Sequence, residues 1–472
     1  MPLNRLWIFL AVGLPALASL LASMSTVDLA YHLRAGNEIL ATGAIPTVDT
    51  WTFTAAGLPW VDQQWGAQIV FAVAERLGGW TGLAILRATL TGAIFACVVL
   101  IGLRRGLDAR SAALLAIVVF VLAAPAMALR PQLLGMACFA LVLVLVTDRR
   151  AHPGRLWLVP PIVAVWANLH GSFFLGPVIL GLAWLEDLND RVADAHRTVL
   201  VAAVSAAAAC LTPFGPAVWL YALALSVNPE VTSRITEWQP TSVRDVPGLL
   251  FFASVIVVVA ILGRRGRPTP WPTLAWLAVF FVIGVYAQRG LAWWPLGAAA
   301  AIAGTLVTAR TGETPVDTPL IRRLNLVVAG SLVLAALALL PAWRPIDPGT
   351  RTPVAVLADA PSGITAALRT SSRPGDRVFN PQVWGSWFLY ALPDRAVAID
   401  SRIEFFPVEV WNDYERVLAG ADGWQAIMQR WNVDVVVVEG DDRSGLGARL
   451  VRAGWREVYR DTDGRILVPD AG

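Results

Sequence analysis

The segment RLWIFLAVGLPALASLLASMSTVDLAYHLRAG, residues 5–36, joins an apolar run directly to a polar one. The apolar half, Leu6 to Ser23, is long enough to cross a hydrocarbon core about 30 Å thick as a helix. The polar half begins at Asp28, near the point where the chain leaves the membrane. A cleaved signal peptide can start in the same way, but we predict a retained span because many similar apolar runs follow.

The composition extends this prediction to most of the chain. Of the 472 residues, 56% are hydrophobic and only 15% are charged, whereas soluble domains average about 25% charged residues. A backbone inside a bilayer has no water to bond, so the spans must be helices and the fold class is an all-α polytopic membrane bundle. The apolar segment 213–227 is short, and whether it crosses stays open. We predict about eleven transmembrane helices, near residues 6–23, 81–103, 111–129, 131–147, 155–169, 171–186, 197–212, 247–263, 271–288, 291–308 and 325–341.

The placement of arginine predicts the orientation of these helices, because short cytoplasmic loops are enriched in Lys and Arg. With the N-terminus in the cytoplasm, the basic loops all fall on the cytoplasmic side. The long first outer loop, 24–80, and the C-terminal region are then extracytoplasmic. The cytoplasmic loops 104–110, 148–155, 187–197, 264–270 and 309–324 contain Arg104, Arg105, Arg110, Arg149, Arg150, Arg155, Arg191, Arg197, Arg264, Arg265, Arg267, Arg310, Arg322 and Arg323.

The sequence changes character after Pro341, where charges become frequent and apolar runs shorten. We therefore predict a transmembrane domain at 1–341, a linker at 342–353 and a small extracytoplasmic α/β domain at 354–472. Predicted strands and helices alternate along this last domain, which supports its α/β class. They predict strands at Arg377–Phe379, Ala396–Ile399, Val433–Val438 and Ile466–Val468, and helices at Gly385–Leu392, Val408–Leu418 and Gly447–Ala453.

Asp28 and His32 are the candidate catalytic residues. They are four positions apart, so they share one face of a helix, with Arg34 close by. A partly desolvated carboxylate at a membrane boundary can serve as a general base near neutral pH. The alternative is that Asp28 only marks the polar end of a span. Asp28 and Asp49 are the candidate contacts for a divalent metal, whose use the sequence leaves open.

The rest of the first outer loop carries another carboxylate, Asp62, and three tryptophans, Trp51, Trp60 and Trp65. Tryptophan rings suit a belt at the membrane–water interface. They also suit a stacking surface for a sugar or a lipid headgroup, and the sequence leaves both interpretations open.

Further polar residues are predicted to lie near the outer ends of the spans. An ionisable group in a membrane is costly unless it has a partner or a purpose. Several Arg side chains at one face can bind a phosphate or diphosphate. The alternative is that each Arg reaches to the interface or pairs with a nearby carboxylate. The candidate residues for binding a lipid phosphate are Arg34, Arg87, Arg130, His170, Glu237 and Arg289.

Trp384, Asp400 and Arg402 form the densest functional candidate in the C-terminal region. Asp400 follows a predicted strand, where ligand-contacting residues of α/β folds are often found. We predict that these residues contact an acceptor. The alternative is an Asp–Arg pair that stabilises the domain.

Several of these segments resemble the GT-C glycosyltransferase superfamily, including bacterial polytopic members and the catalytic subunits of oligosaccharyltransferases. In the latter, an acidic residue of the first outer loop precedes a stretch like Tyr31-His-Leu-Arg34. The chain lacks the Trp-Trp-Asp-Tyr-Gly signature of those subunits. The other matching segments are Ala-Leu-Arg130-Pro-Gln, Trp166-Ala-Asn-Leu-His170-Gly, Thr212-Pro-Phe-Gly, Glu237-Trp-Gln-Pro, Phe379-Asn-Pro, Trp384-Gly and Asp400-Ser-Arg402, so the resemblance covers nearly the whole chain.

The resemblance implies an enzyme of a bacterial inner membrane that moves a sugar from a polyprenyl-phosphate carrier to an acceptor of the cell envelope. The acceptor would be a glycan, a lipid or a protein, and nothing indicates a nucleic-acid partner. Asp28 matches the acidic position of the first loop and is the candidate base or metal contact. A lipid-carrier flippase or transporter, and a non-catalytic scaffold with an outer binding domain, stay open as alternatives.

Overall fold

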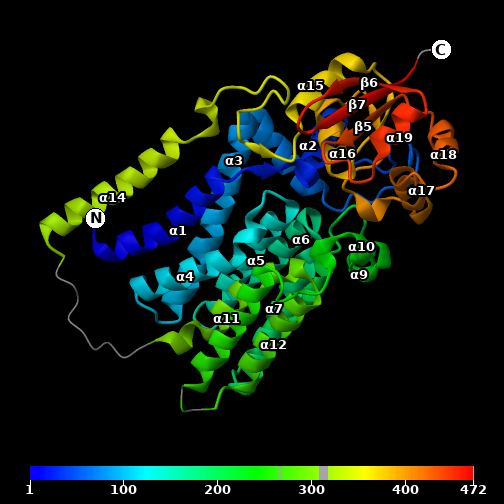
Figure 1. Ribbon diagram of the computed structural model, residues 1–472. Coiled ribbons are helices and arrows are strands. Elements are labelled where there is room, and N and C mark those ends of the chain that lie inside the picture. The colour runs from blue at the N-terminus through cyan, green and yellow to red at the C-terminus, as the bar shows by residue number, and fades with distance from the viewer. Residues whose placement is uncertain (265, 267, 308–316, 471–472) are drawn as a thin grey trace. The chain divides into compact units, whose positions relative to one another are not determined.

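A computed structural model describes residues 1–264, 266, 268–307 and 317–470 of the chain (Figure 1). The chain forms two compact units. The first unit contains residues 1–21 and 84–340, and the second contains residues 22–83 and 341–472. The first outer loop and the C-terminal region, which are far apart in the sequence, therefore belong to one unit.

The first unit is helical in its described part. Several of its helices begin at residues that satisfy the free backbone N–H groups of a first turn: Asp108 caps α4, Asp245 caps α11 and Thr318 caps α14. Its helices are α1 (Leu3–Leu21), the later part of α3 (Trp65–Arg104), α4 (Ala109–Ala123), α5 (Pro131–Thr147), α6 (Val159–Leu169), α7 (Leu175–Asn189), α8 (Ala195–Ala208), α9 (Ala217–Val227), α10 (Pro229–Arg234), α11 (Val246–Gly263), α12 (Trp271–Tyr286), α13 (Trp294–Ile302) and α14 (Pro319–Ala338).

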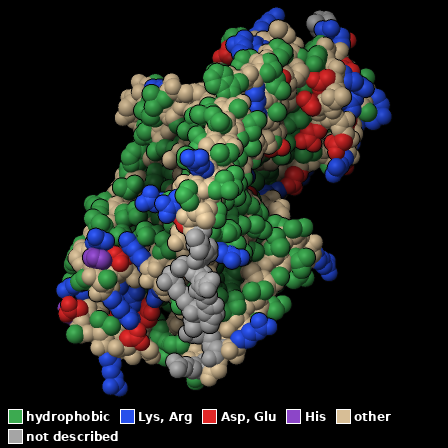
Figure 2. All heavy atoms as spheres, turned by 90° about the vertical axis from the view of Figure 1, so that its left-hand side faces the viewer, with side chains coloured by type: hydrophobic (Ala, Val, Ile, Leu, Met, Phe, Trp, Pro, Cys, Tyr) green, Lys and Arg blue, Asp and Glu red, His purple; other side chains and the backbone are tan. Residues whose placement is uncertain are grey.

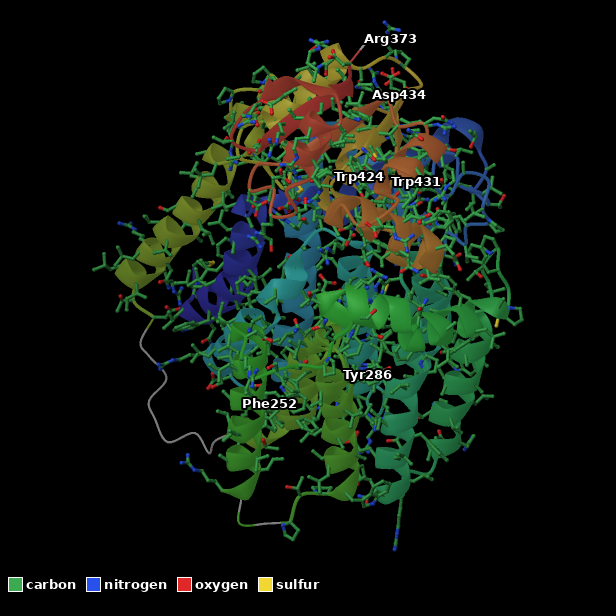
Figure 3. All side chains as sticks on the ribbon, turned by 45° about the vertical axis from the view of Figure 1, so that its right-hand side comes forward. Phe252, Tyr286, Arg373, Trp424, Trp431 and Asp434 are labelled. Carbon is green, nitrogen blue, oxygen red and sulfur yellow. The ribbon has the colours of Figure 1, made fainter. Side chains whose placement is uncertain are left out.

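This unit has the properties of a membrane bundle. Six helical segments in the described residues are long and apolar enough to cross a bilayer, and three more apolar helices are shorter. Apolar side chains make up much of the face shown in Figure 2. Helix α12 begins at the exposed Trp271 and ends at the exposed Tyr286, with apolar residues between them (Figure 3). Aromatic residues at both ends of an apolar helix are typical of a transmembrane span.

Each predicted span overlaps at least one of these helices. The predicted span 291–308 differs most, because α13 ends at Ile302 and a 3₁₀ turn, Ala303–Leu306, follows it. Residue 308 and the loop residues Arg265, Arg267 and Arg310 lie outside the described part of the chain. The uncertain segment 213–227 contains the helix α9.

An aromatic cluster forms part of the core of the first unit. The ring centroid of Phe139 on α5 lies 5.6 Å from that of Phe280 on α12 and 5.1 Å from that of Trp293. Trp166 on α6 is fully buried beside Phe139. Edge-on packing of this kind links three helices through large apolar contacts.

Charged residues join the ends of α5, α7 and α8. Arg149 donates to Asp187 at 2.8 Å and to Glu186 at 2.9 Å, and Thr198 also donates to Asp187. Arg104, at the end of α3, pairs with Asp148 at 3.4 Å. The Arg-rich loops 104–110, 148–155 and 187–197 thus meet at the same end of the first unit.

The second unit contains a five-stranded sheet with the strand order β4-β3-β5-β7-β6. The strands β4, β3 and β5 are parallel, whereas β7 is antiparallel to both β5 and β6. The strands are β3 (Arg377–Phe379), β4 (Ala396–Val397), β5 (Val435–Glu439), β6 (Trp455–Arg460) and β7 (Gly464–Pro469), and the helices are α15 (Ser362–Ser371), α16 (Gln382–Ala391), α17 (Val408–Ala419), α18 (Trp424–Arg430) and α19 (Leu446–Arg452).

The core of this unit lies between the sheet and its helices. Val436 and Leu467 of the sheet pack with residues of α17 and α18, and Trp431 follows α18 directly (Figure 3). The four predicted strands all overlap observed ones. Strand β6 was missed because its side chains are mostly half-buried and polar, as at many sheet edges.

The first outer loop is built into the same unit through backbone pairing. Strand β1 (Met24–Ser25) pairs in parallel with β2 (Leu357–Ala358), and Thr52 forms a bridge with Val397 of β4. Helix α2 (Thr26–Thr42) follows β1, with Ser25 at its N-cap. Helix α3 then begins at Trp65 and is interrupted at Gly78 and Gly79, which have non-helical backbone angles.

Candidate functional site

Asp28, Tyr31 and His32 occupy one face of α2, as their spacing predicts. Asp28 is in the first turn, where the helix dipole favours a carboxylate. The rings of Tyr31 and His32 are 4.0 Å apart, and His32 is buried. Burial raises the pKa of Tyr31 well above its usual value, and the negative charges of Asp28, Glu404 and Asp62 raise it further. Tyr31 is therefore a neutral phenol within a cluster rich in carboxylates.

Asp62 also belongs to this cluster, although its sequence context does not distinguish it from the other polar residues of the first outer loop. Its side chain is buried, and its Oδ1 accepts a hydrogen bond of 2.7 Å from Gln68 Nε2. Burial raises the pKa of Asp62 to about 7, although the Gln68 hydrogen bond and the charge of Arg402 act in the opposite direction. A carboxyl group that titrates near neutral pH in a polar cluster is a candidate for proton transfer. Because burial causes the shift, only the packed structure could reveal it.

Arg402 lies at the centre of a buried charge network. Its Nη2 donates to Asp400 at 2.6 Å and to Asp49 at 2.7 Å, and all three side chains are inaccessible to solvent or nearly so. Its guanidinium carbon lies 4.7 Å from the ring centroids of both Trp51 and Trp60. Burial lowers the pKa of Arg402, but the two carboxylates more than offset this effect and raise it above its usual value. The network joins the first outer loop to the chain after β4.

These contacts bear on several predicted site residues. The Arg402 guanidinium lies over the rings of Trp51 and Trp60, so each ring has a packing role within the unit. Their predicted roles in an interfacial belt or a ligand surface stay predictions. The alternative of a stabilising Asp–Arg pair describes the contacts of Asp400 and Arg402. Trp384, on α16, is largely buried and packs edge-on against Phe388. An acceptor role for Trp384, Asp400 and Arg402 stays a prediction.

Arg34 is held against α16 within the second unit. Its Nη1 donates to the carbonyl oxygen of Leu389 at 2.7 Å, and its guanidinium carbon is 5.1 Å from the Trp51 ring centroid. Burial lowers the pKa of Arg34, while Glu38 acts in the opposite direction. These contacts show that Arg34 packs within the second unit. Its role in binding a lipid phosphate stays a prediction.

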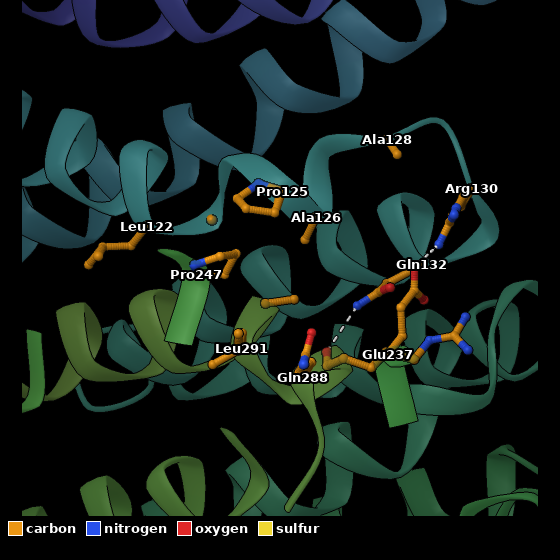
Figure 4. Close-up of a pocket in the computed structure, with 13 residues that line it drawn as sticks. Leu122, Pro125, Ala126, Ala128, Arg130, Gln132, Glu237, Pro247, Gln288 and Leu291 are labelled. Carbon is orange, nitrogen blue, oxygen red and sulfur yellow. Dashed lines mark hydrogen bonds and ion pairs between the residues drawn. The ribbon is translucent and has the colours of Figure 1, made fainter. Parts of the chain in front are cut away.

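The first unit contains a cavity of about 130 Å³ that brings together Arg130, Glu237 and Arg289 (Figure 4). Arg130 precedes the first turn of α5, Glu237 is in the 3₁₀ turn Thr236–Trp238, and Arg289 is in the 3₁₀ turn Gln288–Ala292. The rest of the lining is mostly apolar and includes Leu122 and Leu291. The cavity is thus amphipathic, with cations along an apolar wall.

Two of these charges are already paired. Arg130 forms an ion pair with Glu237, and both side chains remain partly accessible. Gln132, on the first turn of α5, donates to the carbonyl oxygen of Arg289 at 3.3 Å. The guanidinium carbon of Arg289 lies 5.5 Å from the ring centroid of Trp238. Arg289 forms no ion pair with a carboxylate in the part of the chain that the structure describes, where its contacts are with the Trp238 ring and, through its carbonyl oxygen, with Gln132.

Arg87 and His170 are not among the residues that line this cavity. Arg87 is buried within α3. His170 separates α6 from the following 3₁₀ turn, and its Nδ1 accepts a hydrogen bond of 3.2 Å from the backbone N–H of Ser172. This contact caps the turn. Phosphate binding by Arg87 and His170 stays a prediction.

The residues that the structure describes contain no cluster of three or more His, Cys, Asp or Glu side chains arranged to hold a metal ion. Asp49, one of the two candidate metal contacts, is committed to Arg402 and to Thr52, whose hydroxyl donates to Asp49 at 2.7 Å. Asp28 lies in the first turn of α2. The two carboxylates are thus in different surroundings, which does not fit a shared metal ion.

No protein-family model and no curated protein sequence matches the chain. Solved structures do match it. The archaeal oligosaccharyltransferase AglB from Archaeoglobus fulgidus, in complex with an inhibitory peptide and a dolichol-phosphate, gives a TM-score of 0.56 at 13% identity over 98% of this chain and 74% of that one. ArnT from Cupriavidus metallidurans, bound to undecaprenyl phosphate, gives 0.54 at 15% identity over 98% of both chains. Arabinofuranosyltransferase AftD from Mycobacteria gives 0.55 at 17% identity, over all of this chain and 42% of that one.

These three proteins are GT-C glycosyltransferases. This chain therefore has the GT-C fold, as its sequence motifs led us to expect. At such low identity the agreement concerns the fold, and the chemistry must be argued from the residues.

Proposed function

We propose that this protein is a membrane glycosyltransferase that moves a sugar from a polyprenyl-phosphate carrier to an acceptor of the cell envelope. The observation that carries the proposal is the amphipathic cavity of the first unit. Its apolar wall suits an isoprenoid chain, and Arg130 and Arg289 suit a phosphate. Two of the structures with the same fold contain lipid phosphates, a dolichol-phosphate in AglB and undecaprenyl phosphate in ArnT.

The ion pair of Arg130 with Glu237 fits a site that exchanges partners. An arriving phosphate would compete with the carboxylate of Glu237 for the guanidinium. When the bond between the sugar and the phosphate breaks, the electron pair of that bond stays on the phosphate oxygen. Arg130 and Arg289 would stabilise the charge that develops there.

Asp28 is the proposed base in this reaction. It would take the proton of the acceptor hydroxyl while that oxygen bonds to the sugar, with His32 hydrogen-bonding to the reacting groups. Asp28 is half-buried in the first turn of α2, whereas Asp49 is engaged by Arg402 and Thr52. We place the reaction on the extracytoplasmic face of an inner membrane, because the Arg-rich loops mark the opposite side as cytoplasmic.

Lipid binding is the direct test. Purified protein in mild detergent would be mixed with undecaprenyl phosphate or with undecaprenol, which lacks the phosphate, and examined by native mass spectrometry. We expect selective retention of the phosphate in the wild type and in Asp28→Asn, and its loss in Arg130→Ala. Arg110→Ala is the matched control, because Arg110 lies at the first turn of α4 beside Trp7, away from the cavity lining.

Transfer activity then separates binding from catalysis. Asp28→Asn should bind the carrier but transfer no sugar, whereas the exposed control Glu409→Gln should keep both properties. Equal retention of the phosphate and the alcohol by every variant would contradict the proposal. That outcome would favour the transporter or scaffold alternatives.

A further inference from the structure

Asp62 has an asymmetric environment that the proposed transfer reaction does not use. Its Oδ1 accepts the hydrogen bond from Gln68, but its Oδ2 is buried and has no hydrogen-bond partner among the described residues. A buried anion with an unsatisfied oxygen is costly, so this environment favours the protonated form. The Asp62 carboxyl can therefore gain or lose a proton. Gln68 is the one residue whose side chain forms a hydrogen bond with this carboxyl among the described residues.

Gln68 links Asp62 to His32. Its Nε2 lies 2.7 Å from Asp62 Oδ1 and 3.4 Å from His32 Nδ1, and its side chain is fully buried. An amide nitrogen has two hydrogens to donate. With Asp62 ionised, one hydrogen goes to the carboxylate and the other points to His32 Nδ1. That nitrogen must then be an acceptor, so the proton of the neutral ring is on Nε2.

The direction of both hydrogen bonds reverses when Asp62 is protonated. Its carboxyl then has an O–H to donate, and a donating amide nitrogen no longer matches it. A half-turn of the Gln68 amide exchanges its nitrogen and oxygen, which differ little in size. The oxygen, which has no partner in the present orientation, would accept from both Asp62 and His32 Nδ1–H. In this exchange between the two neutral tautomers of the ring, the proton gained from solvent resides on Asp62.

We propose that Asp62 and Gln68 are positioning residues that determine which ring nitrogen of His32 carries the proton. His32 Nε2 would donate a hydrogen bond when Asp62 is ionised and accept one when Asp62 is protonated. His32 shares its helix face with Asp28, so this choice would control how His32 assists the transfer reaction. The effect on the transfer reaction rests on the proposed function. The link between the protonation of Asp62 and the tautomer of His32 does not.

Other charged groups act on the same cluster and must be considered. Arg402 favours the ionised form of Asp62. On α2, Tyr31 contacts the His32 ring, and the charges of Asp28 and Glu404 act on Tyr31. None of these groups bonds to the Gln68 amide in the side-chain contacts of the described residues, so the amide remains the direct connection between Asp62 and His32.

The test uses the full-length protein in detergent and needs no substrate. The chain has only four histidines, so isotope-labelled histidine gives a tractable nitrogen NMR spectrum, and His32→Gln identifies the signals of His32. In the wild type we expect the His32 ring proton to move from Nε2 to Nδ1 as the pH is lowered, with a midpoint near pH 7. Asp62→Asn should remove the exchange between the two neutral tautomers, because an asparagine side chain cannot gain or lose a proton in this pH range.

Gln68→Met provides a second variant that keeps the side-chain volume but removes the amide. It should also abolish the pH-dependent exchange, even if Asp62→Asn does not fold. Asp470→Asn, at an exposed position, is the control and should behave as the wild type. An unchanging His32 tautomer in the wild type, or the same transition in Gln68→Met, would overturn the proposal. Failure of carrier binding, in contrast, would leave this measurement unaffected.

Discussion

The substitution Arg402→Met tests whether the buried charge network holds the second unit together. The substitution keeps an unbranched side chain of similar length but removes the cation between Asp49 and Asp400. Both carboxylates are then left buried and without their counter-charge. Removing one partner of a buried ion pair costs about 3–5 kcal/mol.

The aromatic contacts of Arg402 add to this magnitude. Its guanidinium carbon is 4.7 Å from the centroids of Trp51 and Trp60 and 4.8 Å from that of Phe405. A desolvated cation–π contact is worth about 2 kcal/mol, although Met retains part of the packing. We therefore expect the free energy of unfolding to fall by about 5 kcal/mol, which corresponds to a fall in Tm of roughly 15 °C for a unit of this size.

Pulse proteolysis with trypsin in increasing urea measures this loss, because unfolding of the second unit exposes its arginines to cleavage. Arg443→Met is the matched control: Arg443 belongs to the same unit but is 90% exposed, and its loss should leave the urea midpoint unchanged. Neutralising the two carboxylates as well, with Asp49→Asn and Asp400→Asn, should restore part of the stability lost in Arg402→Met. An Arg402→Met midpoint equal to that of the control would refute the reasoning.

Three further predictions concern packing, charge and pH. A Cβ atom on Gly36 would lie 2.1 Å from the carbonyl oxygen of Gln68, so Gly36→Val should prevent α2 from packing on α3 and reduce the yield of monodisperse protein in size-exclusion chromatography. Arg149→Met leaves Asp187 buried beside fewer donors and should lower the free energy of unfolding by about 3 kcal/mol, measured as a lower thermal aggregation temperature. Asp62 releases its proton near pH 4 when unfolded but near pH 7 when folded, so the unfolded state binds fewer protons between these values. Stability should therefore fall as the pH rises from about 4 to about 7, by at most about 4 kcal/mol, and Asp62→Asn should lose this dependence in urea unfolding at each pH.

Hydropathy was sufficient to predict the long apolar helices of the first unit, because a long apolar segment in a bilayer must be helical. A run such as 247–263 must be helical if it lies in a bilayer, whatever surrounds it, and α11 occupies 246–263. The bounds of α13 could not be predicted in this way. The apolar run continues past Ile302, but the backbone tightens into a 3₁₀ turn there, and apolar composition does not distinguish the two helix types.

The cavity was partly predictable from topology. Arg130, Glu237 and Arg289 are all at predicted outer ends of spans, so they were expected on the same side, and the structure brings them into one cavity. Arg87 and His170 were assigned to the same side, but neither lines it. The number of preceding spans predicts on which side of the membrane a residue lies. The direction in which its side chain faces depends on packing partners that the sequence does not specify.

The three carboxylates of the first outer loop show where sequence reasoning ends. Asp28, Asp49 and Asp62 look equivalent as polar residues in one segment, yet each meets a different environment. Asp49 is paired with Arg402, which is 353 residues away in the sequence, and this partner commits it to holding the unit together. Asp62 is buried with a single side-chain hydrogen bond, from Gln68, and burial raises its pKa to about 7 although Arg402 acts in the opposite direction. Asp28 stays half-exposed on a helix face with a histidine. Each carboxylate thus takes its chemistry from surroundings supplied by packing, and Asp28 is the least buried of the three.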